Sequence, residues 1–226
     1  MTTTAKSTSE DDEGPLTPSI VYIIDDDEDV RVSLGSLLRS VGHRVQVFSS
    51  PVEFLTLPRE SIPSCLILDV RLRSESGLAF QQSLANREPP IPILIITGFP
   101  DVEMSVKAMK AGAMDFFPKP LREQDLLDAV TRALRRDAER LAFESSIATL
   151  RRRYESLTPK EHDVLEYVLA GLLNKQIADE MHLSEITIKM HRGQVMRKMG
   201  VGSLVDLTRN AQLLGVSPRP RRSRST

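Results

Sequence analysis

Residues 20–26 read Ile20-Val21-Tyr22-Ile23-Ile24-Asp25-Asp26, a short apolar run that ends in two carboxylates. A second apolar run, residues 65–70, contains Asp69 near its end, and a third, residues 91–96, leads into Thr97. Continuous apolar runs of this length are typical of strands that are covered on both faces, as in a parallel sheet. The sequence therefore predicts a parallel sheet with polar side chains at the carboxyl ends of its strands.

Amphipathic segments with helical spacing separate these runs. In the first of them Val30, Leu34 and Leu38 recur every four residues, and Gly42 follows as a candidate C-cap. The predicted strands are 20–24, 44–48, 65–70, 91–96 and 115–117, and the predicted helices are 30–41, 52–57, 77–85, 102–110 and 121–136. This alternation predicts a doubly wound α/β domain, with five parallel strands and helices on both faces of the sheet.

Ionisable and hydroxyl side chains follow these strands, at the sheet edge where open α/β folds bind their ligands. They are Asp25, Asp26, Asp69, Thr97 and Lys119. Three carboxylates would repel one another without a cation, and oxygen ligands suit Mg²⁺. A carboxylate beside Mg²⁺ and a lysine could accept a phosphoryl group, because both cations neutralise charge on the transferring oxygens. Each acid alone is better explained as a solvated loop residue or a helix cap, but five such groups at successive strand ends favour a site.

These residues lie in four motifs, which are Ile23-Ile24-Asp25-Asp26, Leu68-Asp69-Val70-Arg71, Ile95-Ile96-Thr97-Gly98 and residues 111–120, ending in Lys119-Pro120. In order and spacing they resemble the CheY-like receiver domain of two-component response regulators, over about residues 20–136. The resemblance implies phosphorylation by a sensor histidine kinase. One departure is the pair Leu72-Arg73, where the family often has Met-Pro.

The resemblance also implies a role for each strand-end residue. It implies Asp69 as the phosphoacceptor, and Asp25, Asp26, Asp69 and the main-chain carbonyl of Arg71 as the Mg²⁺ ligands. It implies Thr97 and Phe116 as a switch pair and Lys119 as a contact to the phosphoryl oxygens. The Lys119–Pro120 bond is typically cis in this family, against about 5% of X–Pro bonds in general.

The near-neutral chain hides a charge asymmetry. Residues 1–131 carry 12 basic and 20 acidic side chains, whereas residues 132–226 carry 18 and 11. Net charges of −8 and +7 suggest an acidic module joined to a second one that binds a polyanion. The alternative is two solvated surfaces that happen to differ in charge.

Residues 127–154 contain neither glycine nor proline and predict a long helix. Leu127, Leu134, Leu141 and Ala148 recur every seven residues, as in a coiled coil. The alternative is a single helix that lies against one of the domains. In either case residues 137–156 are predicted to be a helical linker between two domains.

The C-terminal module has the pattern of a helix-turn-helix. Thr158-Pro159-Lys160-Glu161 predicts a capped helix start, and Gly171 ends that helix. A short helix capped by Asn174 runs to about Met181 and is followed by a turn at His182-Leu183 and by a longer basic helix capped by Ser184. A fourth helix begins at Ser203 and ends at Gly215. Such a pair of helices places the second one in the major groove of DNA, although an ordinary four-helix bundle with basic faces has the same pattern.

Several short runs in this module carry a second resemblance. They are Leu157-Thr158-Pro159-Lys160-Glu161, Asn174-Lys175-Gln176-Ile177-Ala178, Thr187-Ile188-Lys189, His191-Arg192 and Leu213-Leu214-Gly215. They resemble the LuxR-type helix-turn-helix domain, with the motif at about Asn174–Gly193 and the domain at 157–215. The whole chain therefore resembles a NarL/FixJ-class transcriptional response regulator, nearest to the FixJ-like branch.

The second resemblance implies a set of DNA contacts and partners. The predicted DNA-binding residues are Lys175, Thr187, Lys189, Met190, Arg192, Arg197 and Lys198. Gly193 occupies a base-facing position of the family but has no side chain with which to read a base. The implied partners are double-stranded promoter DNA, RNA polymerase and, on phosphorylation, a second copy of the chain.

Composition indicates where in the cell the protein is located. The polar segment 1–19 lacks the apolar core of a signal peptide and is predicted to be a disordered tail, as is the basic segment 216–226. The single cysteine, Cys65, excludes an internal disulfide framework, and no apolar run is long enough for a membrane span. We therefore expect a cytoplasmic protein without membrane association.

Two rival functions remain at this stage. An aspartate-nucleophile phosphatase would need a second acid two residues after Asp69, where Arg71 stands. A constitutive regulator that is independent of phosphate would not need the set of strand-end residues. The favoured function is therefore a DNA-binding response regulator, not an enzyme, that is switched by aspartyl phosphorylation.

Overall fold

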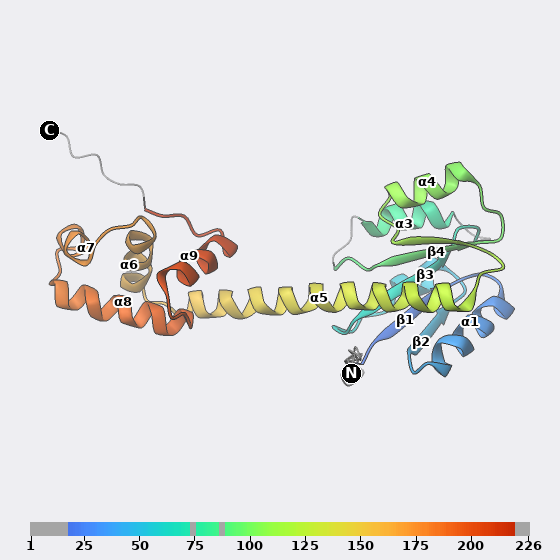
Figure 1. Cartoon of the computed structure of the whole chain (residues 1–226), viewed down its shortest axis with the longest axis horizontal. Coiled ribbons are helices and arrows are strands. Elements are labelled where there is room, and N and C mark those ends of the chain that lie inside the picture. The colour runs from blue at the N-terminus through green and yellow to red at the C-terminus, as the bar shows by residue number, and fades with distance from the viewer. Residues whose placement is uncertain (1–17, 73–75, 86–88, 220–226) are drawn as a thin grey trace, which may run out of the picture. The chain divides into compact units, whose positions relative to one another are not determined.

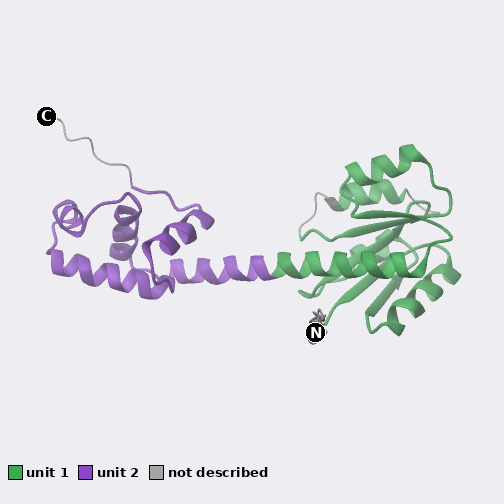
Figure 2. Ribbon diagram, viewed as in Figure 1, with its two compact units in different colours: residues 1–141 green, residues 142–226 purple. Residues whose placement is uncertain are grey.

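The computed structural model describes residues 18–72, 76–85 and 89–219. It divides into two compact units, residues 1–141 and 142–226 (Figure 2). The predicted tails 1–19 and 216–226 lie outside the described residues, except for residues 18–19 and 216–219. Arg73, from the departure in the loop motif, also lies outside them.

The first unit contains the predicted parallel sheet (Figure 1). Its strands are β1 (Ile20–Ile24), β2 (Arg44–Phe48), β3 (Ser64–Asp69), β4 (Ile93–Thr97) and β5 (Asp115–Pro118). Their order is β2-β1-β3-β4-β5, and every adjacent pair is parallel. From β1 the chain first adds β2 on one side of the sheet and then adds β3, β4 and β5 on the other side. Doubly wound sheets form their binding crevice at such a reversal, which here lies between β1 and β3. The predicted fold class is confirmed.

The helices of this unit are α1 (Glu28–Ser40), α2 (Pro51–Leu55), α3 (Gly77–Ala85), α4 (Val102–Lys110) and the first part of α5 (Glu123–Glu155). Each face of the sheet has its own apolar core. On one face Tyr22 packs with Phe54 and Phe80, and on the other Leu38 packs with Val130. Because both faces are covered, the three central strands β1, β3 and β4 are buried along their whole length and mostly apolar instead of alternating.

Strand β4 starts two residues later than the predicted 91–96 run. Pro92 has no N–H to donate to the sheet, although its carbonyl oxygen accepts a hydrogen bond from the Leu66 N–H at 2.9 Å. Proline at this position therefore sets the beginning of the strand, and Ile91 lies before it.

Helix α5 is continuous across the boundary between the two units. Leu126 and Val130 are buried in the receiver-like core, whereas Leu150 is buried in the core of the second unit. The sequence predicts that the last helix of the first domain ends at residue 136 and that a linker begins at residue 137. This border lies inside the single helix α5. Whether two copies of α5 form a coiled coil stays a prediction.

The second unit is built from α6 (Pro159–Leu169), α7 (Asn174–Met181), α8 (Glu185–Met199) and α9 (Leu204–Leu213), with the end of α5. Thr158 and Glu161 form the predicted capping box of α6, and Ser184 caps α8. The N-cap of α7 is Leu173 and not the predicted Asn174. Gln176 accepts the hydrogen bond of the Leu173 N–H at 2.8 Å, so a glutamine inside the helix satisfies the donor.

The segment just after α9 is attached to the second unit. Arg219 places its guanidinium 2.6 Å from an Asp163 carboxylate oxygen and 4.9 Å from the ring centroid of Tyr167. The predicted disorder therefore does not extend to residues 216–219, because an ion pair and a cation–π contact hold their end on α6. Among the described residues, none of the helices combines the length and the apolar character needed to cross a lipid bilayer.

Candidate functional site

The carboxyl ends of the strands bring the three predicted acids together. Asp25 and Asp26 follow β1, and Asp69 ends β3, the strand beside it. Each can offer one carboxylate oxygen such that these oxygens lie within 4.8 Å of one another. Asp25 is fully buried and Asp69 is nearly so, while Asp26 is half-buried. Acids so close together in a poorly solvated place need cations to stay ionised.

Lys119 supplies one of these cations from the loop after β5. Its Nζ atom lies 2.7 Å from Asp25 Oδ2 and 2.7 Å from Asp69 Oδ2. Its backbone N–H donates to the Thr97 carbonyl at 2.7 Å, which fixes the lysine to the end of β4. The bond between Lys119 and Pro120 is cis, as the sequence predicts.

Burial and the neighbouring charges shift the pKa values of this cluster in opposite directions. Burial raises the pKa of the Asp25 carboxyl above its ordinary value, although its hydrogen bond with Lys119 acts in the opposite direction. Burial alone would lower the pKa of Lys119, but the hydrogen bonds to Asp25 and Asp69 raise it above its usual value. The lysine therefore stays protonated, and one ammonium faces three carboxyl groups. This excess of oxygen donors fits a hard divalent cation.

Backbone groups orient the two buried acids. The Arg71 N–H donates to Asp69 Oδ1 at 2.9 Å, and the Asp27 N–H donates to Asp25 Oδ1 at 2.9 Å. Both oxygens of Asp69 are therefore held, one by the lysine and one by the main chain of the next loop. The carbonyl group of Arg71 lies in that same loop, two residues after Asp69.

The predicted switch residues lie on the neighbouring strands. Thr97 is fully buried at the end of β4, and its Oγ1 atom accepts a hydrogen bond from the Phe99 N–H at 3.3 Å. Phe116 on β5 pairs with Ile95 and is half-buried against one apolar core. A buried hydroxyl group at the end of β4 and an aromatic ring on β5 thus lie on adjacent strands, and their role as a switch pair stays a prediction.

Three contacts near the acids were not predicted from the sequence. Arg31 on α1 donates to the Asp25 carbonyl at 2.7 Å, and the Arg71 guanidinium lies 4.7 Å from the ring centroid of Phe99. A Cβ atom on Gly77 would lie 2.1 Å from the Asp69 carbonyl oxygen, so only glycine fits there. The glycine is visible in the sequence as a helix start, but its close approach to β3 depends on the fold.

The predicted DNA contacts divide into two groups by exposure. Lys175, Lys189, Met190 and Arg197 are exposed on α7 and α8, so a ligand can reach them. Thr187 is half-buried and its hydroxyl lies 2.8 Å from that of Ser184, in the cap of α8.

Arg192 and Lys198 point to partners inside the second unit. Arg192 donates to the side-chain oxygen of Asn174 at 3.1 Å, which joins α8 to α7. Lys198 Nζ lies 2.6 Å from Glu161 Oε2 and 3.1 Å from the Ser156 carbonyl. Glu161 is 5% exposed and requires a cation, so Lys198 has a structural role in this unit, and its predicted DNA contact stays a prediction.

We expect Lys198→Met to destabilise the second unit by about 2 kcal/mol, because it leaves the Glu161 carboxylate buried without its cation. Burial raises the pKa of Glu161, but the hydrogen bonds and charge of Lys198 and the hydrogen bonds from Thr158 together lower it more, so the net pKa is depressed. A depressed carboxyl pKa stabilises the fold above the ordinary value of about 4.3, and this stability is lost as the pH falls through the folded pKa.

Hydrogen exchange of the α6 and α8 amides, followed against pH, measures both effects. Lys198→Met should speed exchange at neutral pH and remove its acid dependence. Lys189→Met, which removes an exposed lysine from the same helix, is the matched control. Equal exchange in both variants would contradict a structural role for Lys198.

Comparison with known proteins identifies the families that the two units match. The model of the response regulator receiver domain matches residues 21–131, and that of bacterial regulatory proteins of the luxR family matches residues 155–211. Nodulation protein W of Bradyrhizobium diazoefficiens is 47% identical over 201 residues, which are 89% of this chain and 88% of that protein. Transcriptional regulatory protein FixJ of the same species is 41% identical over 198 residues, covering 87% and 96% of the two chains.

A solved structure agrees with these relatives. The structure of response regulator StyR is similar with a TM-score of 0.78 at 41% identity, covering 86% of this chain and 98% of StyR. The two matched models together cover the parallel sheet with its acidic edge and the helical unit with its basic helix. The chain therefore belongs to the family of two-component transcriptional response regulators that join a receiver domain to a LuxR-type DNA-binding domain.

Proposed function

We propose that a sensor histidine kinase transfers a phosphoryl group to Asp69 and that this modification promotes binding of the C-terminal domain to promoter DNA. The observation that carries this proposal is the placement of Asp69 between the Lys119 ammonium and two further acids at one edge of the sheet. The transfer forms a bond between an Asp69 carboxylate oxygen and phosphorus and breaks the bond between phosphorus and the kinase histidine.

The acids also support a Mg²⁺ site. Asp25, Asp26, Asp69 and the main-chain carbonyl of Arg71 would hold the ion, and all four donors are oxygens. When bound, Mg²⁺ supplies positive charge to the oxygens of the transferring group. Lys119 would hold the same group from the other side by hydrogen bonds, and the Arg71 N–H keeps the Asp69 carboxylate oriented toward it.

We expect Mg²⁺ at about ten times its Kd to stabilise the receiver domain by about 1.4 kcal/mol, because the ion binds only the folded acids. Asp26→Ala removes one ligand and should abolish most of this gain. Thermal unfolding with and without Mg²⁺ measures the effect, and Asp29→Ala, an exposed acid of the same loop and helix start, is the control. Equal stabilisation of all three chains would argue against these ligands.

The switch that follows phosphorylation rests on Thr97 and Phe116. In the unphosphorylated structure the Thr97 hydroxyl accepts a hydrogen bond from the Phe99 N–H. A phosphoryl group on Asp69 would offer acceptor oxygens to which this hydroxyl can donate. Thr97 would turn toward the phosphoryl group, and Phe116 would fill the space it leaves. This moves a pre-existing equilibrium between two forms of the domain.

Thr97→Ala should therefore be phosphorylated almost normally but should bind promoter DNA only as well as the unphosphorylated chain. Thr97→Ser keeps the hydroxyl and should retain most of the activation. DNA binding of chains with matched phosphorylation levels measures the difference. Full activation of phosphorylated Thr97→Ala would rule out this role.

The exposed residues of the helix-turn-helix support a contact with DNA. Lys175, Lys189 and Arg197 would bind phosphates or base edges, and Met190 offers apolar contact to a thymine methyl group. Arg192 and Thr187 would orient α7 and α8, and Gly193 lets the helix approach without a side chain. The motif Asn174–Gly193 would thus read one half-site, and a phosphorylation-dependent dimer would read two.

The remaining assignments follow the family. Its members are DNA-binding transcriptional regulators, and we propose that this chain acts in the cytoplasm, contacts RNA polymerase and catalyses no reaction on a small-molecule substrate. Where an aspartate-nucleophile phosphatase would need its second acid, Arg71 instead stacks on Phe99. The intact cluster of Asp25, Asp69 and Lys119 argues against a constitutive regulator.

A further inference from the structure

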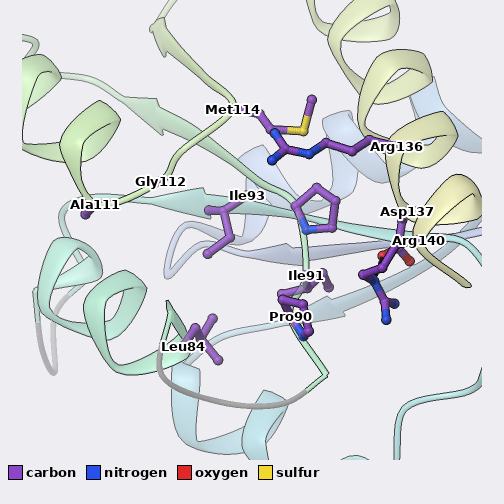
Figure 3. A pocket seen from close by; sticks show the side chains of 11 residues that line it. Leu84, Pro90, Ile91, Ile93, Ala111, Gly112, Met114, Arg136, Asp137 and Arg140 are labelled. Atoms are coloured by element: carbon purple, nitrogen blue, oxygen red, sulfur yellow. Dashed lines mark hydrogen bonds and ion pairs between the residues drawn. The ribbon is translucent and has the colours of Figure 1, made fainter. Parts of the chain in front are cut away.

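A cavity of about 370 Å³ lies at the amino-terminal edge of the receiver sheet, at the opposite ends of the strands from the acidic cluster. The segment before β4 and the residues next to β5 supply an apolar wall, with Ile91, Ile93 and Met114 (Figure 3). Leu84 of α3 closes one side. Cavities between about 300 and 1,000 Å³ with mostly apolar walls are typical of sites for small organic ligands.

Helix α5 supplies the charged side of the cavity, with Arg136, Asp137 and Arg140. Asp137 is 1% exposed and uses both carboxylate oxygens within the domain. Oδ2 accepts from the Ser64 N–H at 2.9 Å and from its hydroxyl at 3.2 Å, and Oδ1 accepts from Arg140 Nε at 2.9 Å. The cavity wall therefore carries two guanidinium groups and one carboxylate, and Arg140 already donates to that carboxylate.

Arg136 is the guanidinium group of this wall that has no partner within the described part of the chain. Within the described part of the chain it makes neither a hydrogen bond nor an ion pair. Its side chain reaches from α5 across the cavity toward Met114 (Figure 3). A guanidinium beside an apolar wall, without an internal acid to neutralise it, is arranged to bind an anion from outside.

A third guanidinium adds to this positive charge. Arg59 lines a neighbouring hollow that shares Leu84 and Ile91 with the cavity. Burial lowers the pKa of Arg59 and the charge of Arg140 acts in the same direction, whereas Tyr22 and Asp137 act in the opposite one. Arg59 therefore places a further guanidinium group near this edge of the sheet.

We propose that this cavity binds a small amphipathic carboxylate, with its apolar ring or chain against Ile91, Ile93 and Met114 and its carboxylate on Arg136. An inorganic anion would leave the apolar wall in contact with water. A neutral apolar molecule would cover Arg136 without a partner and would lose the charge-assisted hydrogen bonds. The ligand class therefore requires both a negative group and an apolar body.

Isothermal titration of the full-length chain with 2-naphthoate tests the proposal, with 2-naphthamide as the uncharged analogue of the same shape and acetate as the anion without an apolar body. We expect saturable binding of 2-naphthoate, and affinities at least about tenfold lower for both analogues, since a charge-assisted hydrogen bond contributes about this factor. Absence of saturable 2-naphthoate binding, or equal affinity for the amide, overturns the proposal.

Two variants locate the site. Arg136→Gln should weaken 2-naphthoate binding about tenfold and leave the thermal midpoint unchanged, because Arg136 is exposed. Arg135→Gln is the matched control, since Arg135 is the adjacent residue of α5 and pairs with Glu139 at 3.2 Å. Unchanged binding by Arg136→Gln, or an equal loss in both variants, would place the ligand elsewhere and refute the assignment.

Discussion

A chain with Asp69→Asn is expected to gain no phosphoryl group from a small acyl phosphate and Mg²⁺, whereas the wild-type chain gains one. An amide cannot replace the carboxylate as nucleophile, because its nitrogen lone pair is delocalised and its oxygen carries no formal charge. The product on the wild type is an acyl phosphate, so hydroxylamine should release the label. Mass spectrometry of the intact chain before and after hydroxylamine measures both results.

The matched control is Asp29→Asn, which removes an exposed carboxylate close to the same edge of the sheet. It should be labelled as fast as the wild type. The asparagine variant should also fail to increase its DNA affinity when the phosphodonor is added. Undiminished label on Asp69→Asn would mean that another group accepts the phosphate, and the assignment of the site would be wrong.

The acidic site was accessible to sequence reasoning because each of its residues lies at the end of a strand or just after it. The parallel arrangement brings all carboxyl ends to one edge, so locating the strands was enough to bring Asp25, Asp69 and Lys119 together. Errors in strand length hardly matter, since β4 starts two residues later and ends one residue later than predicted, and Thr97 still lies at its carboxyl end.

The internal partners of the basic residues in the second unit were harder to predict, because helical periodicity does not show which charged residue pairs within the fold. Lys198 and Arg197 are adjacent and equally basic in the sequence, yet Lys198 reaches Glu161, which lies 37 residues earlier. Likewise, Arg192 is held by Asn174, and only the packing of α7 against α8 determines this pair. The need for glycine at position 77 was missed for the same reason. The Asp69 carbonyl that excludes a side chain there comes close to Gly77 only when the start of α3 folds back on β3.

Lys189→Ala is expected to weaken binding to the specific promoter by about 1–3 kcal/mol, which is a loss of about 5- to 150-fold. Lys189 is exposed on the first turns of α8, and it is the long cationic side chain nearest to the capped start of that helix. A helix start that enters the major groove brings this position to the base edges. Binding curves on specific and scrambled duplexes at several salt concentrations measure the loss.

The salt dependence decides what Lys189 contacts. If its ammonium binds a base edge, Lys189→Ala should relax discrimination between the two duplexes while the salt slope changes little. If it binds only phosphate, both affinities should fall equally and the slope should decrease by about one unit. Lys160→Ala removes the same charge from an exposed position on α6 and controls for the general potential of the domain. Equal affinities of Lys189→Ala and wild type on every duplex would mean that a different face of α8 meets the DNA, because no exposed cation in the groove could be lost without effect.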